Sequence, residues 1–169
     1  MKWGNGVFLS ATLAMVAGCT NLPPVNDTSA PVVAGCAPIT TEVVDAQFQR
    51  FTDAWATGDA ERVADLFAPD AVLLATVSNT PRTTREAIAD YFEHFLVGKP
   101  VARIDTGAIR LGCNSAARFG TWTITLTDAA TGARTEVPAR YTFIYKFQNG
   151  QWWIDHLHSS KMPESAPTH

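Results

Sequence analysis

The sequence predicts an α+β fold in which three helices pack on one side of a strongly curved, mostly antiparallel sheet. Apolar residues recur at helical spacing in the first half of the chain, whereas alternating β-prone runs dominate the second half. Asn149 and Gly150 lie between the last two runs, and an Asn-Gly pair favours a type I′ hairpin turn. Helices followed by hairpin-linked strands are typical of an α+β domain. We expect the twisted sheet to curl around the helices and leave a conical cavity.

The residues before this domain are predicted to direct export. Residues 1–19 have a charged start, an apolar stretch and small residues before Cys19, which is the pattern of a secretory signal peptide. Its last four residues, Val-Ala-Gly-Cys, resemble the bacterial lipobox, so Cys19 is expected to carry a lipid anchor in the periplasm or cell envelope. An ordinary secretory signal cleaved nearby is the alternative. Residues 20–38 are interpreted as a linker, 39–163 as the domain and 164–169 as a tail.

Composition and charge limit the classes of function. With 169 residues and 46% apolar content, the chain can build one domain with a hydrophobic core. A net charge of -3 argues against nucleic acid or an anionic membrane as the main partner. Once Cys19 is processed, Cys36 and Cys113 remain as an even pair, which favours a disulfide in an oxidising compartment. Two unrelated buried thiols are the alternative.

Two helices are expected at the start of the domain. Thr40 or Thr41 can cap the first, in which apolar residues recur every three or four positions, and Gly58 ends it. Asp59 caps a short second helix that Pro69 stops. We expect both helices to pack on the same side of the sheet.

A strand and a third helix come next. Residues 70–77 are mostly apolar and β-prone, so they are interpreted as a strand. Thr83 and Glu86 form a capping box for the third helix, Tyr91 belongs to its apolar stripe, and Gly98 closes it.

The rest of the chain is predicted to form four strands joined by hairpins. Residues 101–111 are a weaker strand, and residues 116–127 alternate between an apolar face and a ladder of threonines. A turn at residues 128–132 leads into the long hairpin of residues 139–164.

The long hairpin is predicted to present two different faces. Counting back from the turn with unbroken pairing puts Tyr141 opposite His158, and side chains alternate along each strand. One face then carries Tyr141, Phe143, Tyr145, Phe147, Trp152, Ile154, His156, His158 and Ser160, and is expected to line a pocket. The other carries Arg140, Thr142, Ile144, Lys146, Trp153, Asp155, Leu157 and Ser159. Because this second face is too apolar to stay fully wet, we expect it to form a homodimer.

Several motifs resemble the nuclear transport factor 2-like superfamily. They are Asp-Ala-Val-Leu-Leu from Asp70, Thr-Arg-Glu-Ala-Ile from Thr84, and Asn-Gly-Gln-Trp from Asn149 running into His-Leu-His-Ser-Ser at 156–160. Within the superfamily, the chain is most similar to the SnoaL-like branch that holds the association domain of calcium/calmodulin-dependent protein kinase and its bacterial relatives. Some of those relatives are iota-class carbonic anhydrases with the signature His-His-His-Ser-Ser, in which Leu157 here replaces the middle His.

This resemblance implies a carbonic anhydrase that hydrates carbon dioxide to bicarbonate in a polar, metal-free pocket. The implied catalytic residues are His158, Ser160, Thr76 and Tyr91, and the implied substrate-binding residues are Ser159, Tyr141 and His156. In this hypothesis His158 orients or deprotonates the attacking water, and the hydroxyls hold bicarbonate. Each residue also has a structural interpretation, in the core or in the sheet.

Three alternatives stay open at this point. The site could use zinc or manganese with His156 and His158 as ligands, although the spacing indicates no third ligand. The domain could instead bind a small ligand or assemble subunits without catalysis. An isomerase or cyclase of the ketosteroid isomerase or SnoaL-like type would need a carboxylate in an apolar pocket, and the expected cavity face of the hairpin has none.

Overall fold

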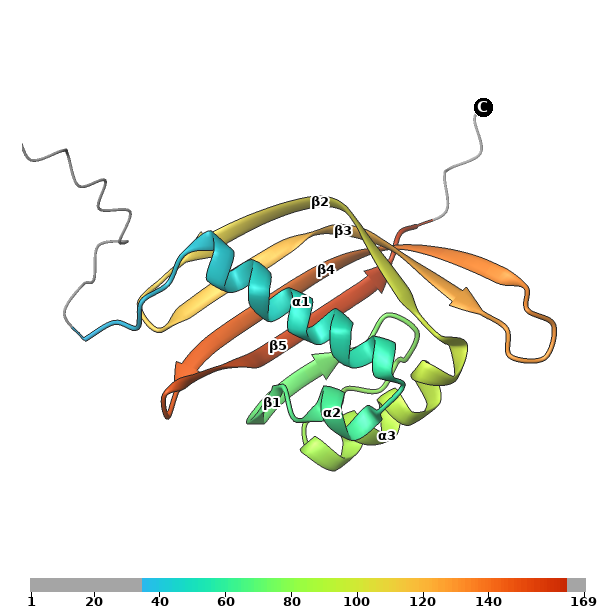
Figure 1. Ribbon diagram of the computed structural model, residues 1–169, viewed down its shortest axis with the longest axis horizontal. Coiled ribbons are helices and arrows are strands. Elements are labelled where there is room, and N and C mark those ends of the chain that lie inside the picture. Colours follow the sequence, from blue (N-terminus) through green and yellow to red (C-terminus); the bar gives the residue numbers. More distant parts are fainter. Residues whose placement is uncertain (1–34, 164–169) are drawn as a thin grey trace, which may run out of the picture.

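The computed structural model describes residues 35–163, which form an α+β domain (Figure 1). The helices are α1 (Thr41–Thr57), α2 (Ala60–Ala64) and α3 (Arg85–Phe95), followed by the short 3-10 helix η1 (Leu96–Gly98). The strands are β1 (Phe67–Leu74), β2 (Val101–Leu111), β3 (Ser115–Thr127), β4 (Arg134–Gln148) and β5 (Gln151–Lys161). The predicted signal peptide, Cys19, most of the linker and the tail lie outside the described residues.

Helix caps set the element boundaries much as the sequence indicates. Thr40 accepts a hydrogen bond from the Val43 amide at the start of α1, and Gly58 ends that helix in the left-handed conformation with φ 71°. The cap of α3 is Thr84 rather than the predicted Thr83, because the Thr84 hydroxyl accepts from the Ala87 amide at 3.2 Å. A single-residue difference of this kind arises where adjacent threonines compete for one cap.

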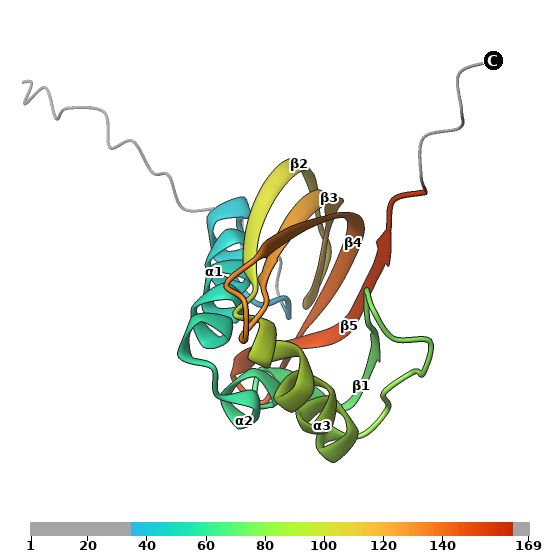
Figure 2. The ribbon, with the colours of Figure 1, turned by 90° about the vertical axis from the view of Figure 1, so that its right-hand side faces the viewer.

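One sheet contains all five strands in the order β1-β5-β4-β3-β2. β1 pairs with β5 in parallel and every other pair is antiparallel, so the predicted mostly antiparallel sheet is confirmed. β1 starts at Phe67, earlier than the predicted Asp70, and includes Pro69, which an edge strand tolerates. Figure 2 shows the sheet curling around the three helices, which lie on its concave side.

The core is an aromatic layer between α1, α3 and the concave face of the sheet. Phe51 on α1 lies 5.1 Å from Phe143 on β4 and 6.0 Å from Phe92 on α3, measured between ring centroids. Trp55 on α1 lies 5.7 Å from Trp122 on β3. Burying such a side chain stabilises the fold by about 1.5–3 kcal/mol, so these contacts fix the helices against the sheet.

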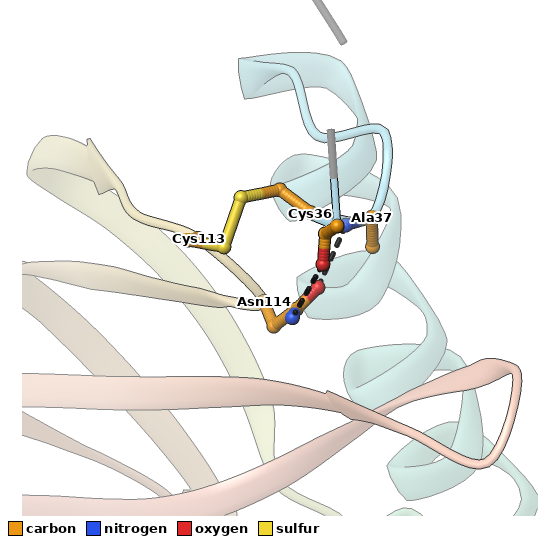
Figure 3. The surroundings of a disulfide bond; sticks show 5 residues. Cys36, Ala37, Cys113 and Asn114 are labelled. Atoms are coloured by element: carbon orange, nitrogen blue, oxygen red, sulfur yellow. Dashed lines mark hydrogen bonds between the residues drawn. A yellow bond between two sulfur atoms is a disulfide. The ribbon is translucent and has the colours of Figure 1, made fainter. Parts of the chain in front are cut away.

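A disulfide joins Cys36 to Cys113 and ties the segment before α1 to the turn between β2 and β3 (Figure 3). Beside it, the Ala37 amide donates to Asn114 Oδ1 at 2.7 Å, and Asn114 Nδ2 donates to the Gly35 carbonyl at 3.2 Å. The predicted pairing is therefore confirmed. Disulfides persist in oxidising, non-cytoplasmic compartments. Among the described helices, none is long and apolar enough to cross a membrane.

Candidate functional site

The β4–β5 hairpin keeps the predicted register only as far as a β-bulge at Asp155. Asn149 and Gly150 form the turn with φ 55° and 82°, and Tyr145 pairs with Ile154 as expected. The next β4 residue, Ile144, pairs with His156, so Asp155 is an extra residue in β5. Lys146 forms ion pairs with Asp155 and with Asp70 of β1, and both carboxylates raise the pKa of Lys146.

The bulge moves every later side chain of β5 to the opposite face. Tyr141 pairs with Ser159 instead of His158. Leu157 is 3% exposed and Ser159 is 5% exposed, and both lie on the concave, inner face. The prediction that His156, His158 and Ser160 share a pocket face with Tyr141 is therefore wrong. A one-residue shift reverses the faces because the side-chain period of a strand is two.

Ser159 is the centre of a small polar cluster, which we name the hydroxyl–indole cluster: Thr76, Trp122 and Ser159. The Thr76 hydroxyl donates to Ser159 Oγ at 2.6 Å, and Trp122 Nε1 donates to the same oxygen at 3.1 Å. Thr76 follows β1, Trp122 lies on β3 and Ser159 lies near the end of β5. Because Ser159 Oγ accepts two hydrogen bonds, its own proton remains to be donated to a further acceptor.

The cluster borders a narrow cavity, the inner recess, between α1, α3 and the sheet. The recess is lined by Trp55, Leu73, Ala75, Thr76, Tyr91, Phe92, Phe95, Trp122, Leu157 and Ser159. The volume open to a water molecule is about 10 Å³, roughly the room for one water. Within residues 35–163, the buried Trp55 Nε1 has no hydrogen-bond partner. Burial raises the pKa of Tyr91, against the opposing effect of Arg82, so its hydroxyl stays protonated at neutral pH.

A wider opening, the mouth cleft, adjoins the inner recess and has a volume of about 640 Å³. Tyr91 and Phe95 line both cavities. The Arg82 guanidinium lies 5.8 Å from the centroid of the Tyr91 ring, close enough for a cation–π contact. His94 also lines the cleft, and its Nδ1 lies 2.8 Å from the Asp90 carbonyl, which raises the pKa of His94.

His158 and Ser160 line a third cavity, the outer groove, on the other side of the Thr76–Ser159 hydrogen bond. The lining residues of this groove are Leu74, Ala75, Thr76, Ser78, Asn79, Thr80, Pro81, His158, Ser159, Ser160 and Lys161. The structure thus brings Thr76, Tyr91 and Ser159 together at the recess and separates His158 and Ser160 from it.

The other two predicted site residues have structural contacts. Tyr141 is 2% exposed in the core, and its hydroxyl donates to the Thr106 carbonyl at 3.3 Å. His156 Nδ1 lies 2.9 Å from the Val72 carbonyl of β1. Because a carbonyl can only accept, this His156 nitrogen carries the proton. The His156 and His158 ring centroids are 6.4 Å apart.

The donor set limits the chemistry that the recess can perform. Its lining contains hydroxyls and indoles but neither a carboxylate nor an imidazole. In the part of the chain that the structure describes, no group of three or more His, Cys, Asp or Glu side chains could hold a metal ion. Trp122 on β3 and Trp55 on α1 occupy apolar positions in the alternation and the helical periodicity of the sequence. Their polar roles depend on contacts between distant elements, so no local sequence signal could have identified them.

Known proteins share this fold. A family model of the SnoaL-like domain matches residues 48–154. A solved structure from Xanthomonas campestris, assigned as a calcium/calmodulin-dependent protein kinase II association domain, is 49% identical with a TM-score of 0.70. The match covers 72% of this chain and 87% of that chain. Curated protein sequences give no match.

More distant structures share the fold alone. An uncharacterized protein with a cystatin-like fold from Caulobacter vibrioides is 22% identical, with a TM-score of 0.61 and coverage of 73% of this chain and 90% of that chain. A ketosteroid isomerase-like protein from Erwinia carotovora atroseptica is 17% identical, with a TM-score of 0.60 and coverage of 72% and 95%. The family model and the 49% identical structure show that the chain belongs to the SnoaL-like domain family.

Proposed function

We propose that the domain binds a small molecule whose oxygen acceptor enters the inner recess and contacts the hydroxyl–indole cluster. The observation that carries this proposal is the double acceptance by Ser159 Oγ, from Thr76 and from Trp122. This arrangement directs the remaining Ser159 proton to a third partner. Hydrogen bonds in such a buried site are stronger than in water because the local dielectric is low.

The surroundings of the cluster favour an acceptor with a larger apolar body. Tyr91 is 8% exposed and keeps its proton, so it offers a second donor in the lining of the recess. The recess holds roughly one polar atom or group, whereas the adjoining mouth cleft has the volume of a small-molecule site. A carbonyl or carboxylate head in the recess, with its body in the cleft, fits both volumes.

The binding proposal can be tested by titrating acetate and longer fatty carboxylates into the isotopically labelled domain and following amide chemical shifts. The expected result is a saturable shift around Ser159 and Tyr91, with affinity that increases with chain length. Ser159→Ala should weaken binding by about tenfold, since one hydrogen bond to a charged group is lost. Ser160→Ala, on the outer face, is the matched control and should bind normally. Equal weakening in both variants, or no saturable shift, would contradict the proposal.

Hydration of carbon dioxide is a second candidate, supported by the size of the recess and by three residues that the resemblance implies. Thr76, Tyr91 and Ser159 line a space that fits one water. In this form of the hypothesis the hydroxyls orient the water as it attacks, and bicarbonate and a proton are the products. His158 lies in the outer groove, so the recess residues and not His158 would contact the reacting atoms.

Stopped-flow carbon dioxide hydration in the presence of a chelator tests this second candidate. Activity that is lost in Ser159→Ala and kept in His158→Ala would support the recess as the site. Activity that appears only with zinc or manganese would favour His156 and His158 as ligands instead. Absence of activity under both conditions would leave ligand binding as the function.

The cofactor requirement, the homodimer and lipidation at Cys19 stay predictions.

Isomerase or cyclase chemistry has less support from this geometry. Ketosteroid isomerase-type chemistry uses a carboxylate base inside an apolar pocket. No carboxylate lines the inner recess, and Asp90 and Asp128, which line the mouth cleft, are exposed. The donor-rich recess is therefore better suited to binding an acceptor than to abstracting a proton from carbon.

A further inference from the structure

The outer groove is lined by His158 and Ser160, two residues of the His-Leu-His-Ser-Ser motif that do not line the inner recess. β1 ends at Leu74, which pairs with His158, whereas β5 continues to Lys161. The last three residues of β5 therefore extend past β1 and form an open edge of the sheet on this side. The groove lies along that edge and has a volume of about 250 Å³.

The opposite wall of the groove is a loop whose two ends are fixed. Leu73 and Arg82 exchange both backbone hydrogen bonds, at 2.8 and 2.9 Å, and thereby close the loop between them. Within the loop the Thr80 amide donates to Ser78 Oγ at 3.3 Å, and Thr76 is held to Ser159 at 2.6 Å. The polar side chains of the loop are thus presented to the β5 edge by a closed structure rather than by a free end.

The side chains that line the outer groove include the Lys161 cation and no anion. The lining combines hydroxyls, the Asn79 amide, the His158 imidazole and the Lys161 ammonium group, and it includes no carboxylate. Lys161 forms no ion pair with the described residues. Ammonium, amide and hydroxyl groups all donate hydrogen bonds, and charge-assisted bonds to an anion are the strongest of these. We propose that the outer groove binds a small oxyanion, held by Lys161, His158 and Ser160.

Size and position make this a separate site from the inner recess. A volume of about 250 Å³ suits a phosphate or sulfate group and is below the usual range for drug-sized ligands. The Thr76–Ser159 hydrogen bond is the boundary between the two cavities, since both residues line each of them. His158, Ser160 and Lys161 line the outer groove and do not line the inner recess.

Amide chemical-shift titrations with inorganic phosphate and with sulfate test the proposal, with sodium chloride at equal ionic strength as the reference. We expect saturable shifts confined to residues 74–81 and 158–161. Lys161→Gln should weaken phosphate binding by about tenfold, because a charge-assisted bond is lost, and Lys161→Arg should restore most of it. Arg134→Gln, which removes an exposed positive charge elsewhere, is the control and should leave the affinity unchanged.

Three results would overturn this inference. Shifts of equal size with chloride would indicate screening rather than binding. Equal weakening by Lys161→Gln and Arg134→Gln would indicate general attraction to positive charge. Unchanged phosphate affinity in both Lys161→Gln and His158→Gln would remove the groove from the binding site. Ser160→Ala and Ser159→Ala separate the two sites, because the first should weaken phosphate binding and the second should weaken carboxylate binding in the recess.

Discussion

Replacing Ser159 with alanine is expected to lower the free energy of unfolding by about 2 kcal/mol. The change removes the oxygen that accepts from Trp122 Nε1 at 3.1 Å and from Thr76 at 2.6 Å. Trp122 is 1% exposed, so its N–H would lose its partner without access to bulk water, at a cost of about 1–2 kcal/mol. Thr76 also lines the outer groove, where its hydroxyl can bond to water, so its loss should cost about 0.5 kcal/mol.

Ser160→Ala is the matched control because Ser160 lies next in the chain but on the opposite face. It should change stability by less than about 0.5 kcal/mol, as is usual for a surface substitution. Urea unfolding with the disulfide intact measures both, and a shift of the midpoint at constant slope reports stability alone. If Ser160→Ala costs as much as Ser159→Ala or more, the bulge at Asp155 is wrong and unbroken pairing is right.

Three further predictions follow from the described contacts. Replacing Cys36 and Cys113 together with alanine opens a loop with a separation of 77 residues and should lower the free energy of unfolding by about 4 kcal/mol, measured by urea unfolding beside the reduced wild type. Burial raises the pKa of Tyr91 and Tyr145, so neither tyrosine should ionise before the protein unfolds. In the unfolded chain both tyrosines lose their protons at lower pH than in the folded protein, so the free energy of unfolding should fall above about pH 10 and not below it. Phenolate absorbance and circular dichroism, recorded together, check this prediction. If the outer sheet face forms the proposed homodimer, Ile144→Lys should yield a folded monomer in sedimentation velocity, whereas a monomeric wild type would contradict it.

Local signals in the sequence anticipated much of the fold. Thr40, Gly58 and Asp59 determine helix ends through bonds and backbone preferences within a few residues. Asn149 and Gly150 determine the hairpin turn for the same reason, because both take a positive φ. Such features depend on neighbours in the chain, so the sequence is sufficient to predict them.

The candidate site was predicted only in part, and the bulge at Asp155 explains the difference. Alternation places Tyr145 and Ile154 correctly because both precede the bulge when the pairs are counted from the turn. Beyond it, the same rule assigns Leu157 and Ser159 to the wrong face. Lys146 forms ion pairs at this point with Asp155 and with Asp70 of the edge strand. These ion pairs join three different strands, so no local sequence pattern predicts them.

The sequence by itself determined the α+β class, the caps, the hairpin turn and the even cysteine pair, because each depends on residue types and short spacings. Only the tertiary structure decided that Ser159 enters the recess with Thr76 and Trp122, and that His158 and Ser160 lie in a separate groove. The physical reason is that packing between β1, β3 and β5 selects which register buries Leu157 and satisfies the Trp122 N–H. One extra residue in β5 then reverses the face of every side chain that follows.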